Sequence, residues 1–140
     1  FVDQCNNLGM KYEVFSVPSA RTPEKFNSAV EEISSEIAGI FKKSGPVGVF
    51  AYCDETALHL RNQLEKDGVR VPEDIQIIGF DGGMIYVNTA LGISSIRQNV
   101  REIALKTTEL LDSQIKGKTS EDVRRFMVPV SFKEGNTTVN

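Results

Sequence analysis

The chain has 140 residues, a length that suits one domain or one large part of a domain. Its 40% hydrophobic and 25% charged residues are typical of a globular protein, and no apolar run approaches the roughly 20 residues that a membrane span needs. The net charge of -3 argues against a nucleic-acid surface on this segment, because phosphate binding needs clustered Lys and Arg.

The first residues include no initiator Met and no signal-peptide pattern, so we expect the chain to begin partway through a longer protein. Cys5 and Cys53 lie far apart and form no Cys-x-x-Cys pair, which indicates reduced thiols. His59 is the only histidine, and its isolation favours a packing or surface role over metal binding. We therefore expect no metal and no cofactor.

Residues 1–8 have the pattern of a helix end, which Gly9 terminates by adopting a positive φ. Residues 12–17 are rich in aromatic and β-branched types and predict a short strand. Pro18 closes this strand, because proline has no N–H to donate to a neighbouring strand.

Three start signals for a helix follow: Thr22 as N-cap, Pro23 at the first helical position and Glu24 in the first turn. The next apolar side chains recur three or four residues apart, which predicts an amphipathic helix that ends near residues 42–43. They are Phe26, Val30, Ile33, Ile37 and Ile40.

Two short apolar runs, residues 47–51 and 75–80, predict buried strands. Between them Asp54 is expected to cap a helix that Gly68 ends. Residues 93–96 are weakly strand-like and precede a further helix.

This later helix begins with a capping box formed by Asn99 and Glu102 and is broken by Gly117. Its expected buried face consists of Val100, Ile103, Ala104, Thr107, Leu110 and Leu111. Residues 126–132 predict a last strand, which Pro129 places at a sheet edge. Strands that alternate with helices in this way predict an α/β fold with a mainly parallel sheet and helices on both faces.

Ligands of open parallel sheets bind beyond the carboxyl ends of the strands. Asp54 follows the first apolar run and Asp81 follows the second, so both carboxylates are candidates to accept hydrogen bonds from ligand hydroxyls. Two alternatives remain: Asp54 serves as a helix N-cap, and Asp81, which precedes Gly82 and Gly83, is an ordinary turn residue.

An enzyme is a competing class, since Cys53 at the head of a helix could act as a nucleophile and Asp54 with Asp81 as an acid/base pair. His59 is the only histidine, however, and neither a second base nor an oxyanion signature accompanies it. The sequence also lacks the dinucleotide and P-loop glycine patterns. We therefore expect binding without catalysis.

Four segments, in order, resemble LacI/GalR-type repressors. Residues 46–57 resemble a strand that runs into a helix, and residues 69–81 contain a typical Val-Pro-Glu-Asp-Ile core and Gly-Phe-Asp end. Residues 93–98 are similar to the Leu-Thr-Thr-Ile/Val-x-Gln hinge crossing of this family. Residues 135–138 are similar to its closing Arg-x-Ser/Thr-Thr signature, although Gly stands where Arg is common.

This resemblance implies a type I periplasmic-binding-protein-like fold, with two α/β subdomains around a cleft. Residues 1–95 and 125–135 would form most of the carboxyl-terminal subdomain, and residues 96–120 would cross to the amino-terminal one. The DNA-binding helix-turn-helix domain and the first strand of the carboxyl-terminal sheet are expected outside this segment. The implied protein is a cytoplasmic homodimeric repressor that binds a small-molecule effector, a sugar or sugar derivative, with no membrane partner.

By position, Asp81 corresponds to the family's carboxylate that binds effector hydroxyls, and Gln98 lies at the cleft hinge. Cys53 occupies a place that is often Asn, and Asp54 lies beside it. Ala20 falls where some members place an aromatic residue that stacks on the sugar, so the identity of the sugar stays open.

A periplasmic sugar-binding protein of a transport system is the alternative, since it shares this fold. The Val-Pro-Glu-Asp-Ile signature favours the repressor. Half of a two-lobed domain leaves apolar surface uncovered, so we expect the fragment to self-associate, or the 99–116 helix to repack on its own sheet or on a neighbour.

Overall fold

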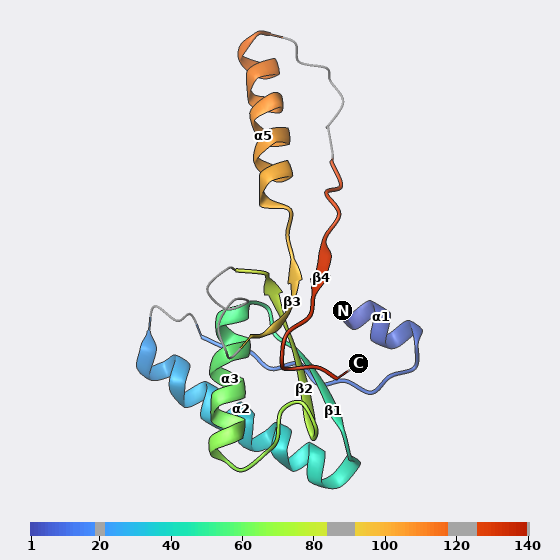
Figure 1. Cartoon of the computed structure of the whole chain (residues 1–140), viewed down its shortest axis with the longest axis vertical. Coiled ribbons are helices and arrows are strands. Elements are labelled where there is room, and N and C mark those ends of the chain that lie inside the picture. Colours follow the sequence, from blue (N-terminus) through green and yellow to red (C-terminus); the bar gives the residue numbers. More distant parts are fainter. Residues whose placement is uncertain (19–21, 84–91, 118–125, 140) are drawn as a thin grey trace.

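A four-stranded sheet organises the chain, and one long arm extends from it (Figure 1). The structure is a computed structural model that describes residues 1–18, 22–83, 92–117 and 126–139. In chain order its elements are α1 (Val2–Asn7), α2 (Pro23–Ser44), β1 (Val47–Phe50), α3 (Asp54–Lys66), β2 (Ile75–Asp81), β3 (Ser94–Arg97), α5 (Val100–Ile115) and β4 (Ser131–Lys133).

The strand order is β1-β2-β3-β4, and the first three strands are parallel. Val47 pairs with Ile75 across β1 and β2, and Ile78 pairs with Ser94 across β2 and β3. The last strand is antiparallel, with Lys133 opposite Ser95. The predicted α/β fold with a mainly parallel sheet is therefore confirmed.

Helices lie on both sides of the sheet, as the sequence predicts. Helices α2 and α3 cover one face and α1 lies on the opposite side (Figure 1). On the α2–α3 side, Ile75, Ile77 and Leu64 are completely buried in the core. On the other side the ring of Phe1, just before α1, stacks on Phe50 with centroids 5.5 Å apart.

The ends of helix α2 lie where the local sequence signals predict them. It begins at Pro23 with Thr22 as N-cap and ends before Gly45, whose φ is +83°. Its predicted stripe faces inward, since Phe26, Val30 and Ile37 are buried. No helix in the described part of the chain combines the length and apolarity needed to cross a membrane.

Two predicted strands differ from the structure. Residues 12–17 form no strand, and among the described residues the edge strand β1 pairs only with β2. Phe15 of this segment packs against the core without contributing to the sheet. The strand predicted over 126–132 is limited to β4, so Pro129 lies before the strand and not within it.

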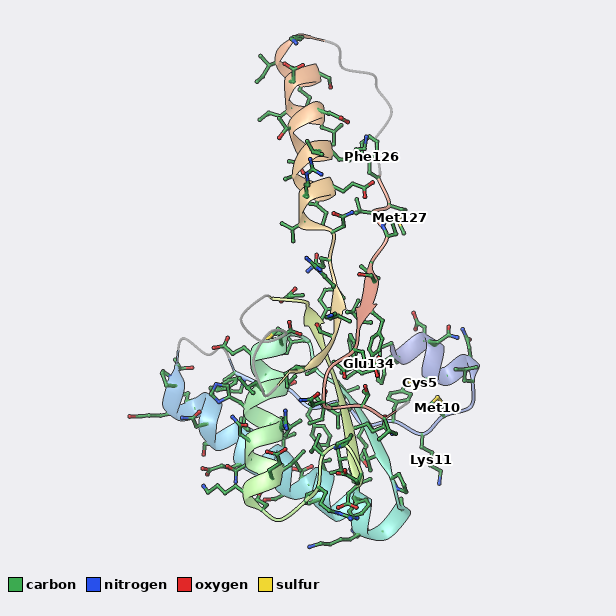
Figure 2. The ribbon with its side chains drawn as sticks, viewed as in Figure 1. Cys5, Met10, Lys11, Phe126, Met127 and Glu134 are labelled. Carbon is green, nitrogen blue, oxygen red and sulfur yellow. The ribbon has the colours of Figure 1, made fainter. Side chains whose placement is uncertain are left out.

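The arm, which is formed by helix α5, differs most from what the sequence predicts. The predicted N-cap is present, since the Glu102 N–H donates to Asn99 Oδ1 at 3.2 Å. Glu102 Oε2 accepts from the Asn99 side-chain amide at 2.9 Å, which differs from the backbone N–H bond of a capping box. The expectation of a buried face is wrong for the described residues, because none in α5 is buried and Val100 and Leu111 are 66% and 56% exposed. The helix projects away from the sheet and does not repack on it (Figure 1). Beside it lie Phe126 and Met127, both exposed (Figure 2).

The closing segment of the chain joins β2 to β3. The Thr137 hydroxyl donates to the Ile77 carbonyl at 2.6 Å and accepts from the Ser94 N–H at 2.9 Å. Thr137 is completely buried. The neighbouring Thr138 is half-buried and its hydroxyl lies 2.7 Å from Ser94 Oγ. This seam fixes the spacing of the two strands that carry the site described next.

We expect Thr137→Val to lower the free energy of unfolding by about 2 kcal/mol, because it keeps the shape but leaves two buried backbone groups without their partner. Thr138→Val is the matched control and should cost less than about 1 kcal/mol, since one partly buried contact is lost. Chemical denaturation of both variants measures the difference. Equal losses would contradict the role given to Thr137.

Candidate functional site

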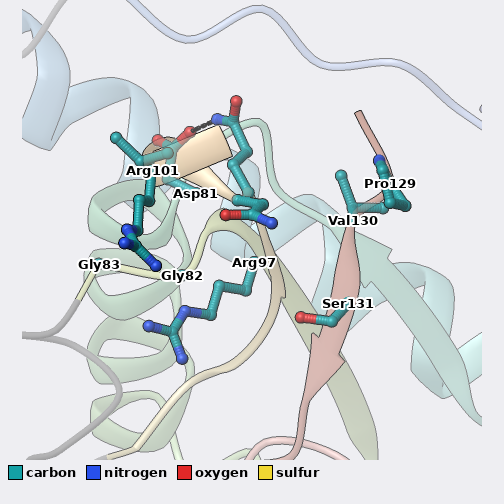
Figure 3. A pocket seen from close by; sticks show the side chains of 11 residues that line it. Asp81, Gly82, Gly83, Arg97, Arg101, Pro129, Val130 and Ser131 are labelled. Carbon is teal, nitrogen blue, oxygen red and sulfur yellow. Dashed lines mark hydrogen bonds between the residues drawn. The ribbon is translucent and has the colours of Figure 1, made fainter. Parts of the chain in front are cut away.

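The carboxyl ends of β2 and β3 lie side by side and border an open hollow of about 830 Å³ (Figure 3). Asp81 at the end of β2 is in register with Arg97 at the end of β3. The remaining lining comes from the turn after β2, the start of α5 and the segment that leads into β4. The full lining is Asp81, Gly82, Gly83, Arg97, Gln98, Asn99, Val100, Arg101, Pro129, Val130 and Ser131.

Asp81 and Gln98 form the polar centre of the hollow. Gln98 Nε2 donates to Asp81 Oδ1 at 2.6 Å, and the bond joins residues 17 positions apart. The Asp81 side chain is exposed, and its second oxygen accepts no hydrogen bond from the described residues. A carboxylate that is oriented by one amide and open at its other oxygen can accept a hydroxyl hydrogen from a ligand.

The backbone around Asp81 is strained. Asp81 has a φ of +102°, which L residues rarely adopt, and Gly82 follows at +66°. A Cβ on Gly82 would lie 2.6 Å from Cβ of Arg97, so only glycine allows the turn to approach β3 this closely. Such strain persists where the surrounding structure holds it, and it is concentrated at functional sites.

Cationic groups also border the hollow. The side chains of Arg97 and Arg101 lie at its wall (Figure 3), and both residues are exposed. Together with Asp81, Gln98 and Asn99 they supply both hydrogen-bond donors and acceptors. This mixture suits a polar ligand with several hydroxyl groups.

Asp54 lies behind this surface and does not line the hollow. The expectation that it caps α3 is wrong, because Cys53 is the N-cap and Asp54 is the first helical residue. Its side chain is 2% exposed and accepts hydrogen bonds from the Gly83 N–H at 2.8 Å and from Ser95 Oγ at 2.5 Å. The Asp54 carboxylate, which the sequence pattern predicts as a helix cap, is therefore bound by donors from distant parts of the chain.

The other candidates lie apart from the hollow or outside the described residues. Cys53 is half-buried, and its Sγ lies 3.3 Å from the Thr56 hydroxyl. His59 packs edge-on against the Phe26 ring, with centroids 5.1 Å apart. Ala20 lies outside the described residues. No group of three His, Cys, Asp or Glu side chains that could hold a metal ion is found in the described ranges.

Arg70 and Asp74 form an ion pair at the opposite end of β2. The hydrogen bond from Arg70 holds the pKa of Asp74 below its ordinary value, and the same bond raises the pKa of Arg70. The two side chains meet with Nη2 and Oδ1 2.5 Å apart. Because this pair precedes β2, it stabilises the connection from α3 and takes no part in the hollow.

Sequence reasoning missed most of the remaining wall. Arg97 could have been found from its place directly before Gln98 at a strand end, where the same rule about carboxyl edges applies. Arg101 is the second residue of α5, and Ser131 reaches the hollow because β4 returns antiparallel to β3. No local pattern marks these two residues as neighbours of Asp81.

Comparison with known proteins gives relatives over the length of the chain. Residues 1–138 match the model of the periplasmic binding protein-like domain. The HTH-type transcriptional repressor PurR of Photobacterium profundum is 33% identical over 94 residues, which are 67% of this chain and 27% of that repressor. The arabinose metabolism transcriptional repressor of Geobacillus stearothermophilus is 28% identical over 105 residues, or 75% of this chain and 29% of the repressor.

Solved structures agree. A LacI family transcriptional regulator from Enterococcus faecium with bound ribose has 28% identity and a TM-score of 0.64, covering 80% of this chain and 40% of its own. A LacI family regulator from Arthrobacter sp. FB24 in complex with lactose has the same fold, with 21% identity, a TM-score of 0.79 and coverage of 99% and 49%. The chain thus spans less than half the length of each of these relatives. It belongs to the periplasmic binding protein-like domain family.

Proposed function

We propose that the hollow at the ends of β2 and β3 binds a small polar effector, a sugar or sugar derivative, and releases it unchanged. The observation that carries the proposal is the Asp81 carboxylate, oriented by Gln98 and open to the hollow at its second oxygen. The ribose in the Enterococcus faecium regulator supports a ligand of this class. Asp81 and Gln98 are the proposed contacts, while contacts from Cys53 and Ala20 stay predictions.

We further propose that the chain is the sensing part of a cytoplasmic bacterial repressor and has no catalytic activity. The similar curated proteins are repressors, which supports this role over that of a periplasmic transport protein. DNA binding would belong to a helix-turn-helix domain outside the chain, in a homodimer. An effector that binds the open and closed forms with different affinities would then change operator binding. A signal peptide in place of the helix-turn-helix domain in the complete gene would contradict this role.

The arm supports the proposed division of the chain. In this proposal, residues 1–95 and 125–135 would form most of the carboxyl-terminal subdomain, and residues 96–120 would cross to the amino-terminal one. Helix α5 has apolar side chains, such as Ile103 and Leu111, that nothing in the described structure buries. The chain also covers only 40% to 49% of the solved relatives, which leaves room for a second lobe that covers this helix.

Asp81→Asn should weaken effector binding by roughly tenfold or more, because a charged acceptor is replaced by a neutral amide at the proposed contact. The measurement is a thermal-shift titration of the complete sensing domain with D-ribose, lactose and sugar phosphates, since a ligand of the native state raises the melting temperature. Glu73→Gln is the control, because Glu73 is exposed and precedes β2 at the end remote from the hollow. An Asp81→Asn variant that binds as tightly as the wild type would refute the assignment.

Leu111→Glu tests the division into subdomains. In a protein that contains both lobes, the charge should lower the free energy of unfolding by about 3 kcal/mol, because it would be buried without a partner. In the isolated chain, where Leu111 is 56% exposed, the change should stay within about 0.5 kcal/mol. Thermal unfolding of both forms gives the comparison, and equal effects would show that the second lobe does not cover α5.

A further inference from the structure

A buried carboxylate lies directly beneath the turn that follows β2. Asp54 opens α3, Ser95 lies in the middle of β3, and Gly82 and Gly83 form the turn. Asp54 and Ser95 are 2% and 0% exposed, so solvent and ligand reach neither side chain. Their chemistry therefore acts on neighbouring groups of the protein.

The hydrogen bonds form one connected chain. The Gly82 N–H donates to Ser95 Oγ at 3.1 Å, and the Ser95 hydroxyl donates to Asp54 Oδ1 at 2.5 Å. The second carboxylate oxygen, Oδ2, accepts the Gly83 N–H at 2.8 Å. Both oxygens of one carboxylate thus hold two consecutive amides of the turn, one directly and one through a serine.

The backbone around this carboxylate is shaped to admit it. A Cβ on Gly79 of β2 would overlap Asp54 Oδ1 and lie 3.1 Å from its Cα, so the absence of a side chain lets α3 come this close. Gly82 meets β3 in the same way at Arg97. Asp54 can therefore lie against β2 while it bonds β3 and the turn, because Gly79 has no side chain to displace it.

The bonded amides adjoin the strained residue. Asp81, with its φ of +102°, comes directly before Gly82 and Gly83. A conformation of this kind needs contacts that over-determine it, because the free backbone prefers negative φ. The bonds to Asp54 and Ser95 pull the next two amides toward the buried side, which leaves the Asp81 side chain on the side of the hollow.

We propose that Asp54 and Ser95 are positioning residues, which hold the 81–83 turn so that Asp81 presents its carboxylate to the hollow. Asp54 acts through Gly83, and Ser95 acts through Gly82. The consequence for effector binding rests on the proposed function. The affinity for the effector would then depend on the Asp54 carboxylate, which the effector does not touch.

The test measures amide hydrogen exchange rates at Gly82 and Gly83 in the ¹⁵N-labelled chain, without any ligand. In Asp54→Asn a single amide oxygen replaces two acceptors, so exchange at Gly82 or Gly83 should speed up by roughly ten- to a hundredfold. The Ile77 amide, which is bonded to the Thr137 carbonyl in the core, is the internal reference and should not change. Unchanged exchange at both glycines would overturn the proposal.

Ser95 supplies a second, independent pair of variants. Ser95→Ala should speed exchange at Gly82, whereas Ser95→Thr keeps the hydroxyl on a strand where β-branched residues fit and should restore protection. A purely structural role would make both changes equally harmful. If Asp54→Asn does not fold, this pair decides the question, and equal exchange at Gly82 in the two variants overturns the proposal.

Asp67→Asn is the matched control. Asp67 follows the other end of α3 and also accepts side-chain hydrogen bonds, from Ser34 at 3.0 Å and from Gln63 at 3.0 Å. Its loss should change stability but leave exchange at Gly82 and Gly83 as in the wild type. An equal acceleration in this variant would show a general loosening and would count against a specific role for Asp54.

A binding measurement separates this proposal from the function proposed above. With D-ribose as the probe and both lobes present, Asp54→Asn should weaken binding by roughly tenfold while Asp67→Asn does not. Wild-type affinity in Asp54→Asn would overturn the positioning role. A wild type that binds none of D-ribose, lactose and the sugar phosphates counts against the proposed function alone, and the amide exchange rates then decide the role of Asp54 and Ser95.

Discussion

The parallel pairing of β1, β2 and β3 is the constraint on which the rest of this structure depends. Parallel strands end at the same edge of a sheet, so residues that follow different strands are brought together there. The register of β2 and β3 places Asp81 opposite Arg97, and Gln98 comes next in the chain. The polar centre of the hollow is therefore a consequence of strand register, and the Thr137 hydroxyl joins the same two strands.

Different residues line the hollow and hold the backbone beneath it. Asp81 faces the hollow, while Asp54 satisfies both of its own oxygens inside the protein. A buried carboxylate is costly unless donors surround it, and here those donors are the amides and hydroxyl that shape the turn. The same groups thus satisfy a buried charge and hold the strained backbone at Asp81.

Elements with local signals could be predicted from the sequence. Thr22 and Pro23 start α2, and Asn99 with Glu102 starts α5, because their signals involve residues within one helical turn. The role of Asp54 could not be predicted in this way, since its partner Ser95 lies 41 positions away. Residues 12–17 likewise have strand composition, but a strand also needs a neighbour to pair with, and composition carries no information on that neighbour.

Helix α5 has the apolar periodicity of an amphipathic helix, but none of its described residues is buried. The arm exposes a cluster of apolar side chains, which is unusual because exposed apolar residues are normally scattered singly. The cluster consists of Val100, Leu111, Phe126 and Met127. The arm also begins at the site itself, because Gln98 bonds Asp81 and the next residue, Asn99, caps α5. A ligand that contacts Asp81 therefore bears on the first residues of the arm. The proposed contact at Asp81 and the first turn of α5 are thus joined through two consecutive residues, Gln98 and Asn99.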